Sequence, residues 1–183
     1  QLILGLSAIR HTISFFKPLV AAAIYQHFLG DVNKPTVIDP CAGFGGRMLG
    51  FKAIYPNGKY IGIEPNKETY TELKELSKNF TNIELHNCKL EDYTGTKKCD
   101  LTFTSIPYFD VEVYSDNIEY SSFDNWNDTF IKSLQTFENK KICMSENISN
   151  KLGFNYEYKL LNNTSHFNQN SKFKYEVITD MEI

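Results

Sequence analysis

A glycine-rich segment between a short apolar run and a helical run is the first feature that could do chemistry. Residues 37–47 read Val-Ile-Asp-Pro-Cys-Ala-Gly-Phe-Gly-Gly-Arg. Because Gly43, Gly45 and Gly46 carry no Cβ, the backbone can approach a ligand closely there. The Asp39 carboxylate ends the apolar run and could accept hydrogen bonds from amine or hydroxyl groups of that ligand. A tight turn beside a solvated acid is the alternative interpretation.

A second acid, Glu64, ends the next predicted strand. An acid at this position binds the two ribose hydroxyls of a nucleoside cofactor. The loop lacks the third glycine of the nicotinamide fingerprint, and Asp39 would repel a pyrophosphate. An aminoacyl nucleoside such as S-adenosylmethionine, with a cationic centre and no phosphate, suits such an acid-lined cleft better.

The segment Thr-Ser-Ile-Pro-Tyr-Phe at residues 104–109 follows another predicted strand. The exocyclic amino nitrogen of cytosine or adenine is a poor nucleophile, because its lone pair is delocalised into the ring. The Ser105 hydroxyl and the carbonyl of Ile106 could accept its two hydrogens and so free the lone pair. Tyr108 offers a face on which a flipped base could stack. The alternative is an ordinary strand-to-loop turn with an exposed tyrosine.

These segments together resemble one family. Residues 39–47 resemble the cofactor loop of Rossmann-type S-adenosylmethionine methyltransferases. Residues 104–109 resemble the (Asp/Asn/Ser)-Pro-Pro-(Tyr/Phe) motif of enzymes that methylate exocyclic amino groups of DNA bases. Residues 14–18, Ser-Phe-Phe-Lys-Pro, resemble the segment that covers the methionine end of the cofactor in those enzymes. The matched segments fall within residues 14–137, most of the chain.

The resemblance implies a methyltransferase that uses S-adenosylmethionine to modify a nucleic-acid base, with DNA as the expected partner and N4-cytosine slightly preferred over N6-adenine. The residues expected around the cofactor are Phe15, Phe16, Asp39, Pro40, Cys41, Ala42, Gly43, Gly45, Glu64, Pro65, Glu91 and Asp92. The residues expected to hold the base are Ser105, Ile106, Pro107 and Tyr108. Glu91 and Asp92 are equally well explained as a helix-capping or solvated pair, and Trp126 is expected in the core.

Ile106 departs from the family pattern, which usually has proline there. Its carbonyl is present, and Pro107 still favours an extended backbone at residue 106. The ring that fixes φ is missing, so lowered activity or an altered target is expected. The substitution Ile106→Pro should therefore preserve or raise activity, unless the N–H of residue 106 is hydrogen-bonded in the fold.

No segment between Glu91 and Ser105 is long enough for a target-recognition domain. A degenerate or cofactor-binding methylase subunit that acts as an interaction module is one alternative. A methyltransferase for RNA or a small molecule is another. A separate specificity or recognition subunit is a further expected partner. The formal net charge of -3, from 19 basic and 22 acidic residues, counts against tight unaided binding of DNA.

Strands alternate with helices along the chain, which predicts a doubly wound α/β fold. We expect a mostly parallel, seven-stranded Rossmann-like sheet with helices on both faces and an antiparallel C-terminal strand pair. Helices are predicted near 15–28, 47–54, 67–79 and 124–137, with Asp124 as the N-cap of the last, and strands near 36–38, 60–63, 83–85, 101–104, 141–144, 156–161 and 173–179.

The composition fits a single domain over residues 1–183, in which residues 1–30 form a helical segment over the cofactor site. Hydrophobic residues make up 42% and charged residues 22%, which excludes a disordered chain. The apolar runs are too short for a membrane span, and residues 2–6 lack the features of a signal peptide. A cytoplasmic protein is expected. The four cysteines show no Cys-x-x-Cys spacing, so no metal site is expected.

Overall fold

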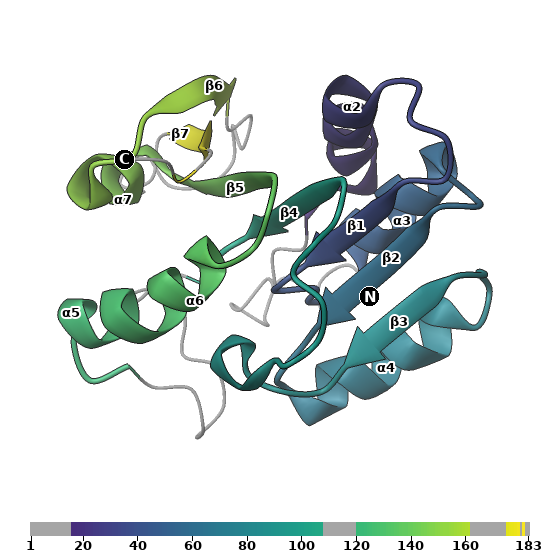
Figure 1. Cartoon of the computed structure of the whole chain (residues 1–183), viewed down its shortest axis with the longest axis horizontal. Coiled ribbons are helices and arrows are strands. Elements are labelled where there is room, and N and C mark those ends of the chain that lie inside the picture. Colours follow the sequence, from purple (N-terminus) through teal and green to yellow (C-terminus); the bar gives the residue numbers. More distant parts are fainter. Residues whose placement is uncertain (1–15, 108–119, 162–174, 180, 182–183) are drawn as a thin grey trace, which may run out of the picture.

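A computed structural model describes residues 16–107, 120–161, 175–179 and 181 (Figure 1). The strands are β1 (Thr36–Asp39), β2 (Lys59–Ile63), β3 (Ile83–His86), β4 (Leu101–Ser105), β5 (Lys140–Ser145), β6 (Tyr156–Leu161) and β7 (Tyr175–Thr179). They form one seven-stranded sheet in the order β3-β2-β1-β4-β5-β7-β6. Strands β1 to β5 run parallel, and β7 pairs antiparallel with both β5 and β6. The predicted mostly parallel sheet with an antiparallel C-terminal pair is confirmed.

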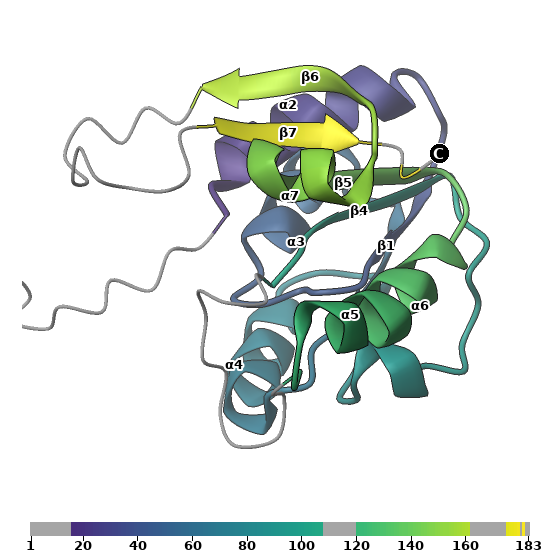
Figure 2. The same cartoon turned by 90° about the vertical axis from the view of Figure 1, so that its left-hand side faces the viewer.

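The helices lie on both faces of this sheet. They are α2 (Pro18–Leu29), α3 (Gly46–Ile54), α4 (Lys67–Ser77), the 3-10 helix η1 (Leu90–Asp92), α5 (Phe123–Trp126), the π-helix η2 (Asn127–Ile131), α6 (Lys132–Gln135) and α7 (Glu146–Leu152). Figure 2 shows α3 and α4 on one side of the strands and α5 and α6 on the other. Within the described part of the chain, no helix is both long enough and apolar enough to cross a membrane.

Successive residues of each central strand belong to two separate cores. On β1, Val37 packs with residues of α2 and α3, whereas Ile38 packs with residues of α5, η2 and α6. On β5, Cys143 lies in the first core and Ile142 in the second. Parallel strands buried on both faces read as nearly continuous apolar runs, which is why 36–38 and 141–144 were recognisable as strands.

The strand order reverses between β1 and β4. Both β2 and β3 lie on one side of β1, whereas β4 and β5 lie on the other. In open α/β sheets, ligands bind in the crevice beyond the carboxyl ends of the strands at such a switch point. The loops that follow β1, β2, β3 and β4 leave the sheet at this edge, because those strands are parallel. The edge carries the predicted site residues.

The helical segment after residue 120 differs from the prediction at its start. Ser122, and not Asp124, is the N-cap, since its hydroxyl oxygen accepts the Asn125 N–H at 3.0 Å. The chain then continues through α5, η2 and α6. Trp126 is fully buried, as predicted, and its ring stacks on Phe130 at 6.0 Å.

Helix α7 was not predicted, because the polar stretch Glu-Asn-Ile-Ser-Asn-Lys-Leu offers only two apolar residues at helical spacing. Those two residues, Ile148 and Leu152, pack against the core that also contains Ile142. A seven-residue helix is too short for periodicity to separate it from a loop.

Helices α2 and α3 are in backbone contact through the glycines of α3. A Cβ added to Gly50 would lie 2.5 Å from the Pro18 carbonyl oxygen and 2.7 Å from the Ala21 Cβ. A Cβ added to Gly46 would overlap the carbonyl group of Phe16. The absence of side chains on this face of α3 therefore lets residues 16–22 lie directly against the helix that follows the glycine loop.

This contact reverses the usual effect of a Gly→Ala change in a helix. In a free helix Gly50→Ala would stabilise by about 0.5–1 kcal/mol. Here we expect the free energy of unfolding to fall by about 1–3 kcal/mol, because the Cβ meets backbone that cannot move alone. Urea titration measures this free energy. The control is Ala53→Gly on the exposed face of α3, which should lower the free energy of unfolding by about 1 kcal/mol. A more stable Gly50→Ala protein would contradict the helix contact.

Candidate active site

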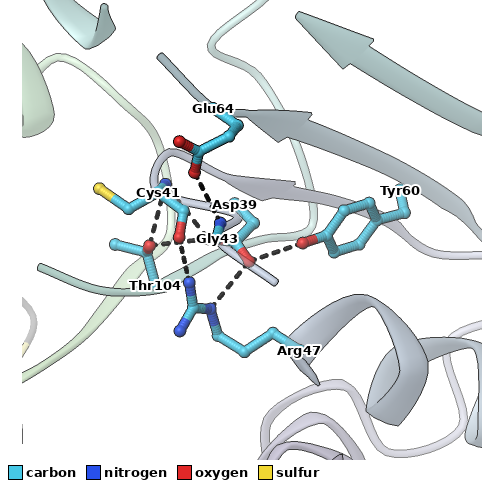
Figure 3. Close-up of polar contacts among 7 residues, drawn as sticks. All are labelled: Asp39, Cys41, Gly43, Arg47, Tyr60, Glu64 and Thr104. Carbon is cyan, nitrogen blue, oxygen red and sulfur yellow. Dashed lines mark hydrogen bonds and ion pairs between the residues drawn. The ribbon is translucent and has the colours of Figure 1, made fainter. Parts of the chain in front are cut away.

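The Asp39 carboxylate, at the end of β1, is the centre of a buried hydrogen-bond network (Figure 3). Its Oδ2 accepts from Arg47 Nε at 2.8 Å and from the Tyr60 hydroxyl at 2.6 Å. Its Oδ1 accepts from the Thr104 hydroxyl at 2.7 Å and from the Cys41 N–H at 3.3 Å. The Arg47 guanidinium also donates to the Cys41 carbonyl. One side chain thus connects β1, β2, β4 and α3.

This network gives Asp39 a different position from the one expected. The side chain is fully buried, and both of its oxygens accept from groups of the protein itself, so it is not exposed to a ligand. Burial alone would lower the pKa of Arg47, but the charge and hydrogen bond of Asp39 raise it overall. The Arg47 guanidinium therefore stays charged beneath the loop. Asp39 acts on the site by fixing the loop that the ligand would meet.

Two glycines of the loop adopt left-handed backbone conformations, with φ of +54° at Gly43 and +81° at Gly45. A Cβ added to Gly45 would lie 2.7 Å from Leu73 Cδ1, so this glycine faces α4. A Cβ added to Gly43 would meet nothing closer than the Cys41 carbonyl oxygen at 3.9 Å. Gly43 therefore presents open backbone, and it is the point at which a ligand can come closest to the chain.

Glu64 lies directly beside Gly43, as the sequence predicts for residues of one site. Glu64 Oε2 accepts the Gly43 N–H at 2.9 Å, and Oε1 accepts the Asn66 N–H at 2.9 Å. Burial raises the pKa of Glu64 above its ordinary value, although these two N–H donors lower it in part. Each carboxylate oxygen can accept a second hydrogen bond. The carboxylate is thus held in place with acceptor capacity for a pair of hydroxyls.

The loop after β3 is fastened to the loop after β2 by an amide. Asn87 Nδ2 donates to the Glu64 carbonyl at 2.8 Å and to the Pro65 carbonyl at 3.0 Å. Beyond it, Glu91 and Asp92 lie in η1. Glu91 is half-buried and accepts from the Tyr120 hydroxyl at 2.9 Å, whereas Asp92 is exposed. A contact between either acid and a cofactor stays a prediction.

The other predicted cofactor residues are distributed around the same loop. Pro40 and Ala42 are buried inside it, and Cys41 is half-buried. The Phe16 ring packs edge-on against Phe103 at 5.6 Å and lies 5.3 Å from the Arg47 guanidinium carbon. Phe16 therefore covers the network around Asp39 from the α2 side. Phe15 lies outside the described residues, as does Tyr108, the residue predicted to stack on a base.

Thr104 connects the cofactor loop to the predicted base-binding segment. Its hydroxyl oxygen accepts the Cys41 N–H at 3.1 Å while its hydrogen goes to Asp39. The next residue, Ser105, ends β4 half-buried, and its hydroxyl has no hydrogen-bond partner among the described residues. The half-buried Pro107 follows two positions later. The first acceptor of the proposed amino-binding motif is thus one residue from the network.

Ile106 has a role in the fold that accounts for its departure from proline. Its N–H donates to the Cys143 carbonyl at 3.3 Å, which extends the β4–β5 ladder by one residue. Its side chain is 2% exposed and belongs to the core that contains Trp126. The condition under which proline is expected to be tolerated at this position, an N–H without a hydrogen bond, is therefore not met.

Four residues of this site, Arg47, Tyr60, Thr104 and Tyr120, were not predicted to have a role in it. Arg47 and Thr104 lie inside the quoted motifs but were given no role, and a polar residue within a buried strand was the available signal for Thr104. Tyr60 lies in an apolar run that predicts a buried strand, but nothing in that run identifies it as a partner of Asp39. Tyr120 carries no local signal, because its partner is 29 positions away.

No protein-family model and no curated protein sequence matches the chain. Solved structures do. A protein assigned to the class I S-adenosylmethionine-dependent methyltransferases from Listeria monocytogenes aligns with a TM-score of 0.61, 10% identity and 91% coverage of this chain. A dimethyladenosine transferase from Plasmodium falciparum aligns with a TM-score of 0.58, 13% identity and 91% coverage of this chain. TYW2 of Pyrococcus horikoshii, solved in complex with MeSAdo, aligns with a TM-score of 0.54, 15% identity and 92% coverage.

The alignments cover 60%, 62% and 63% of those three proteins, so this chain matches less than two thirds of each. At these identities the likeness concerns the fold. The chain has the Rossmann-like fold of S-adenosylmethionine-dependent methyltransferases, and its candidate site lies at the switch point of that fold.

The hydrogen bond of Ile106 predicts the effect of a proline there. Ile106→Pro should lower the free energy of unfolding by about 2–4 kcal/mol, because it leaves the Cys143 carbonyl without its donor and removes buried methyl groups. Ile106→Val, which keeps the N–H, should lose only about 1 kcal/mol. Urea unfolding of both variants gives the comparison. Equal stabilities would mean that the ladder hydrogen bond is unimportant.

Proposed function

We propose that the chain is an S-adenosylmethionine-dependent methyltransferase that modifies an exocyclic amino group of a nucleic-acid base, with DNA as the first substrate and N4-cytosine slightly ahead of N6-adenine. The observation that carries this proposal is the position of Thr104. Its hydroxyl is hydrogen-bonded both to Asp39 and to the Cys41 N–H, so it fastens the candidate cofactor loop to the strand end that bears Ser105. A donor and an acceptor of a methyl group must meet at such a junction.

The residues at the junction fit a nucleoside cofactor without phosphate. Glu64 supplies a buried, oriented carboxylate for the ribose hydroxyls, and Gly43 leaves open backbone beside it. The Glu64 carboxylate beside Gly43 would also repel a phosphate there. The presence of MeSAdo in the TYW2 complex supports an adenosyl ligand on this fold. When bound, S-adenosylmethionine would supply an electrophilic methyl group.

The residues after β4 would prepare the accepting nitrogen. The Ser105 hydroxyl and the carbonyl of Ile106 would accept the two amino hydrogens, which favours a pyramidal nitrogen with an available lone pair. Pro107 holds residue 106 in an extended backbone, so the direction of that carbonyl is restricted. Transfer then depends chiefly on positioning. The likeness in fold to a dimethyladenosine transferase from Plasmodium falciparum supports an amino nitrogen of a base as the target.

The charge of the chain bears on how it would reach a nucleic acid. With a formal net charge of -3, the chain has little electrostatic attraction for phosphates. Recognition of a DNA sequence would therefore depend on a separate specificity subunit or domain, which is part of this proposal.

The test is transfer of a labelled methyl group to duplex DNA, RNA and free nucleosides, followed by nucleoside mass spectrometry. Ser105→Ala should lower transfer to the amino nitrogen by about 10–100-fold, because one acceptor that acts in the transition state is removed. Binding of S-adenosylhomocysteine should be unchanged. Ser77→Ala on α4 is the matched control. Transfer to RNA alone would mean that the substrate is RNA and not DNA. No methyl transfer by a protein that binds the cofactor would refute the proposal.

The raised pKa of Glu64 predicts a pH dependence of cofactor binding. A protonated carboxyl loses one acceptor, so affinity for S-adenosylhomocysteine should fall as pH falls through the Glu64 pKa, which lies above 4.5. Glu64→Gln should bind about 1.5–3 kcal/mol more weakly at neutral pH and lose this dependence. Calorimetric affinities of the wild type and Glu64→Gln, measured across the pH range, show whether Glu64 or another acid causes the pH dependence. An unchanged affinity in Glu64→Gln would place the cofactor elsewhere.

A further inference from the structure

The hydrogen bond between Tyr120 and Glu91 joins two parts of the chain that no motif connects. The Tyr120 hydroxyl lies 2.9 Å from Glu91 Oε1, across 29 positions of sequence. Glu91 follows β3 in η1, and Tyr120 precedes α5. The second oxygen of Glu91, Oε2, has no hydrogen-bond partner among the residues that the structure describes. The carboxylate is therefore held by one oxygen and available through the other.

The position of the Tyr120 hydroxyl is fixed by packing. The ring lies edge-on to Phe130 at 6.2 Å, and Phe130 in turn stacks on the buried Trp126. The backbone just after Tyr120 is held by the capping bonds of α5, in which the Ser122 hydroxyl accepts from the Asn125 N–H and Asn125 Oδ1 accepts from the Ser121 N–H at 3.3 Å. A tyrosine anchored in this way can hold a carboxylate in one orientation.

The hydroxyl is also a permanent donor. Burial and the adjacent Glu91 charge raise the pKa of Tyr120 well above its ordinary value, so its O–H keeps its proton at any physiological pH. A hydrogen bond from a neutral donor to a carboxylate is charge-assisted and therefore strong and directional. Glu91 consequently presents its second oxygen as an oriented acceptor.

The neighbouring strand ends indicate what that acceptor would meet. Glu64 ends β2, Glu91 follows the adjacent β3, and Asn87 ties the two loops together through the Glu64 and Pro65 carbonyls. A nucleoside whose ribose lies at Glu64 would extend its base along this edge. An amino group can donate a hydrogen bond to a carboxylate oxygen. A 6-oxo oxygen cannot, and it would be repelled by the carboxylate because both groups are acceptors.

We propose that Tyr120 is a positioning residue that orients Glu91 toward the adenine amino group of the cofactor and so makes the site prefer adenine over a 6-oxo purine. This inference rests on the proposed function, because it takes the ribose to lie at Glu64. Tyr120 itself touches no reacting atom.

The test compares the binding of S-adenosylhomocysteine with that of its 6-oxo analogue, S-inosylhomocysteine, by calorimetry. The wild-type protein should prefer the adenine compound by about tenfold or more. Tyr120→Phe keeps the ring on Phe130 but removes the donor, so it should bind S-adenosylhomocysteine about 3–10-fold more weakly and the analogue equally well. Tyr93→Phe is the matched control, because the Tyr93 hydroxyl, also beside η1, bonds to the Thr96 carbonyl at 3.2 Å and not to Glu91.

A double-mutant cycle provides the second measurement. Glu91→Gln should lose the preference for adenine, and adding Tyr120→Phe to it should cost nothing more, since both changes remove one interaction. An unchanged preference in Tyr120→Phe would overturn the inference, as would tighter binding, which would mean that Tyr120 occupies the base site. A wild-type protein that binds neither compound would instead refute the cofactor in the proposed function, and the inference with it.

Discussion

The Asp39 carboxylate accepts four hydrogen bonds from groups that belong to four separate parts of the chain, and the candidate site depends on that convergence. Arg47 comes from the first turn of α3, Tyr60 from β2, Thr104 from β4 and the Cys41 N–H from the loop itself. A buried charge without partners would be very costly, and removal of either Arg47 or Asp39 would leave the other uncompensated. The network therefore defines a single arrangement of the strand ends at the point where strand order reverses.

The proposed chemistry follows from what this arrangement leaves available. Because Asp39 is fully engaged inside the protein, the described groups that can meet a ligand include the open backbone at Gly43, the carboxylate of Glu64 and the hydroxyl of Ser105. Glu64 is itself bonded to the Gly43 N–H, so the acid and the loop move as one unit. Thr104 transmits the same constraint to Ser105, its neighbour in β4. The groups proposed to bind cofactor and substrate are thus positioned by one polar core, and reactions that depend on positioning need such rigidity.

Local sequence patterns were sufficient to predict the sheet and to place the candidate site residues at one edge of it. Apolar runs identified the strands, and alternation with helices implied a parallel sheet with ligand residues at its carboxyl edge. The side-chain partners of Asp39 and the contact of Tyr120 with Glu91 were not accessible in this way, since they join residues 8 to 65 positions apart and depend on tertiary packing. The same reason explains Ile106, whose N–H partner lies on a different strand. The Asp124 cap failed because Ser122 was an equally good capping residue two positions earlier.

A crystal structure of the protein with bound S-adenosylhomocysteine tests the central claim most directly. The account predicts that both ribose hydroxyls lie within about 3 Å of the Glu64 carboxylate oxygens. It also predicts that the amino-acid part of the ligand passes over Gly43, while the Asp39 carboxylate keeps its four internal partners. A ligand bound away from Glu64, or one that draws Asp39 out of its network, would contradict the account.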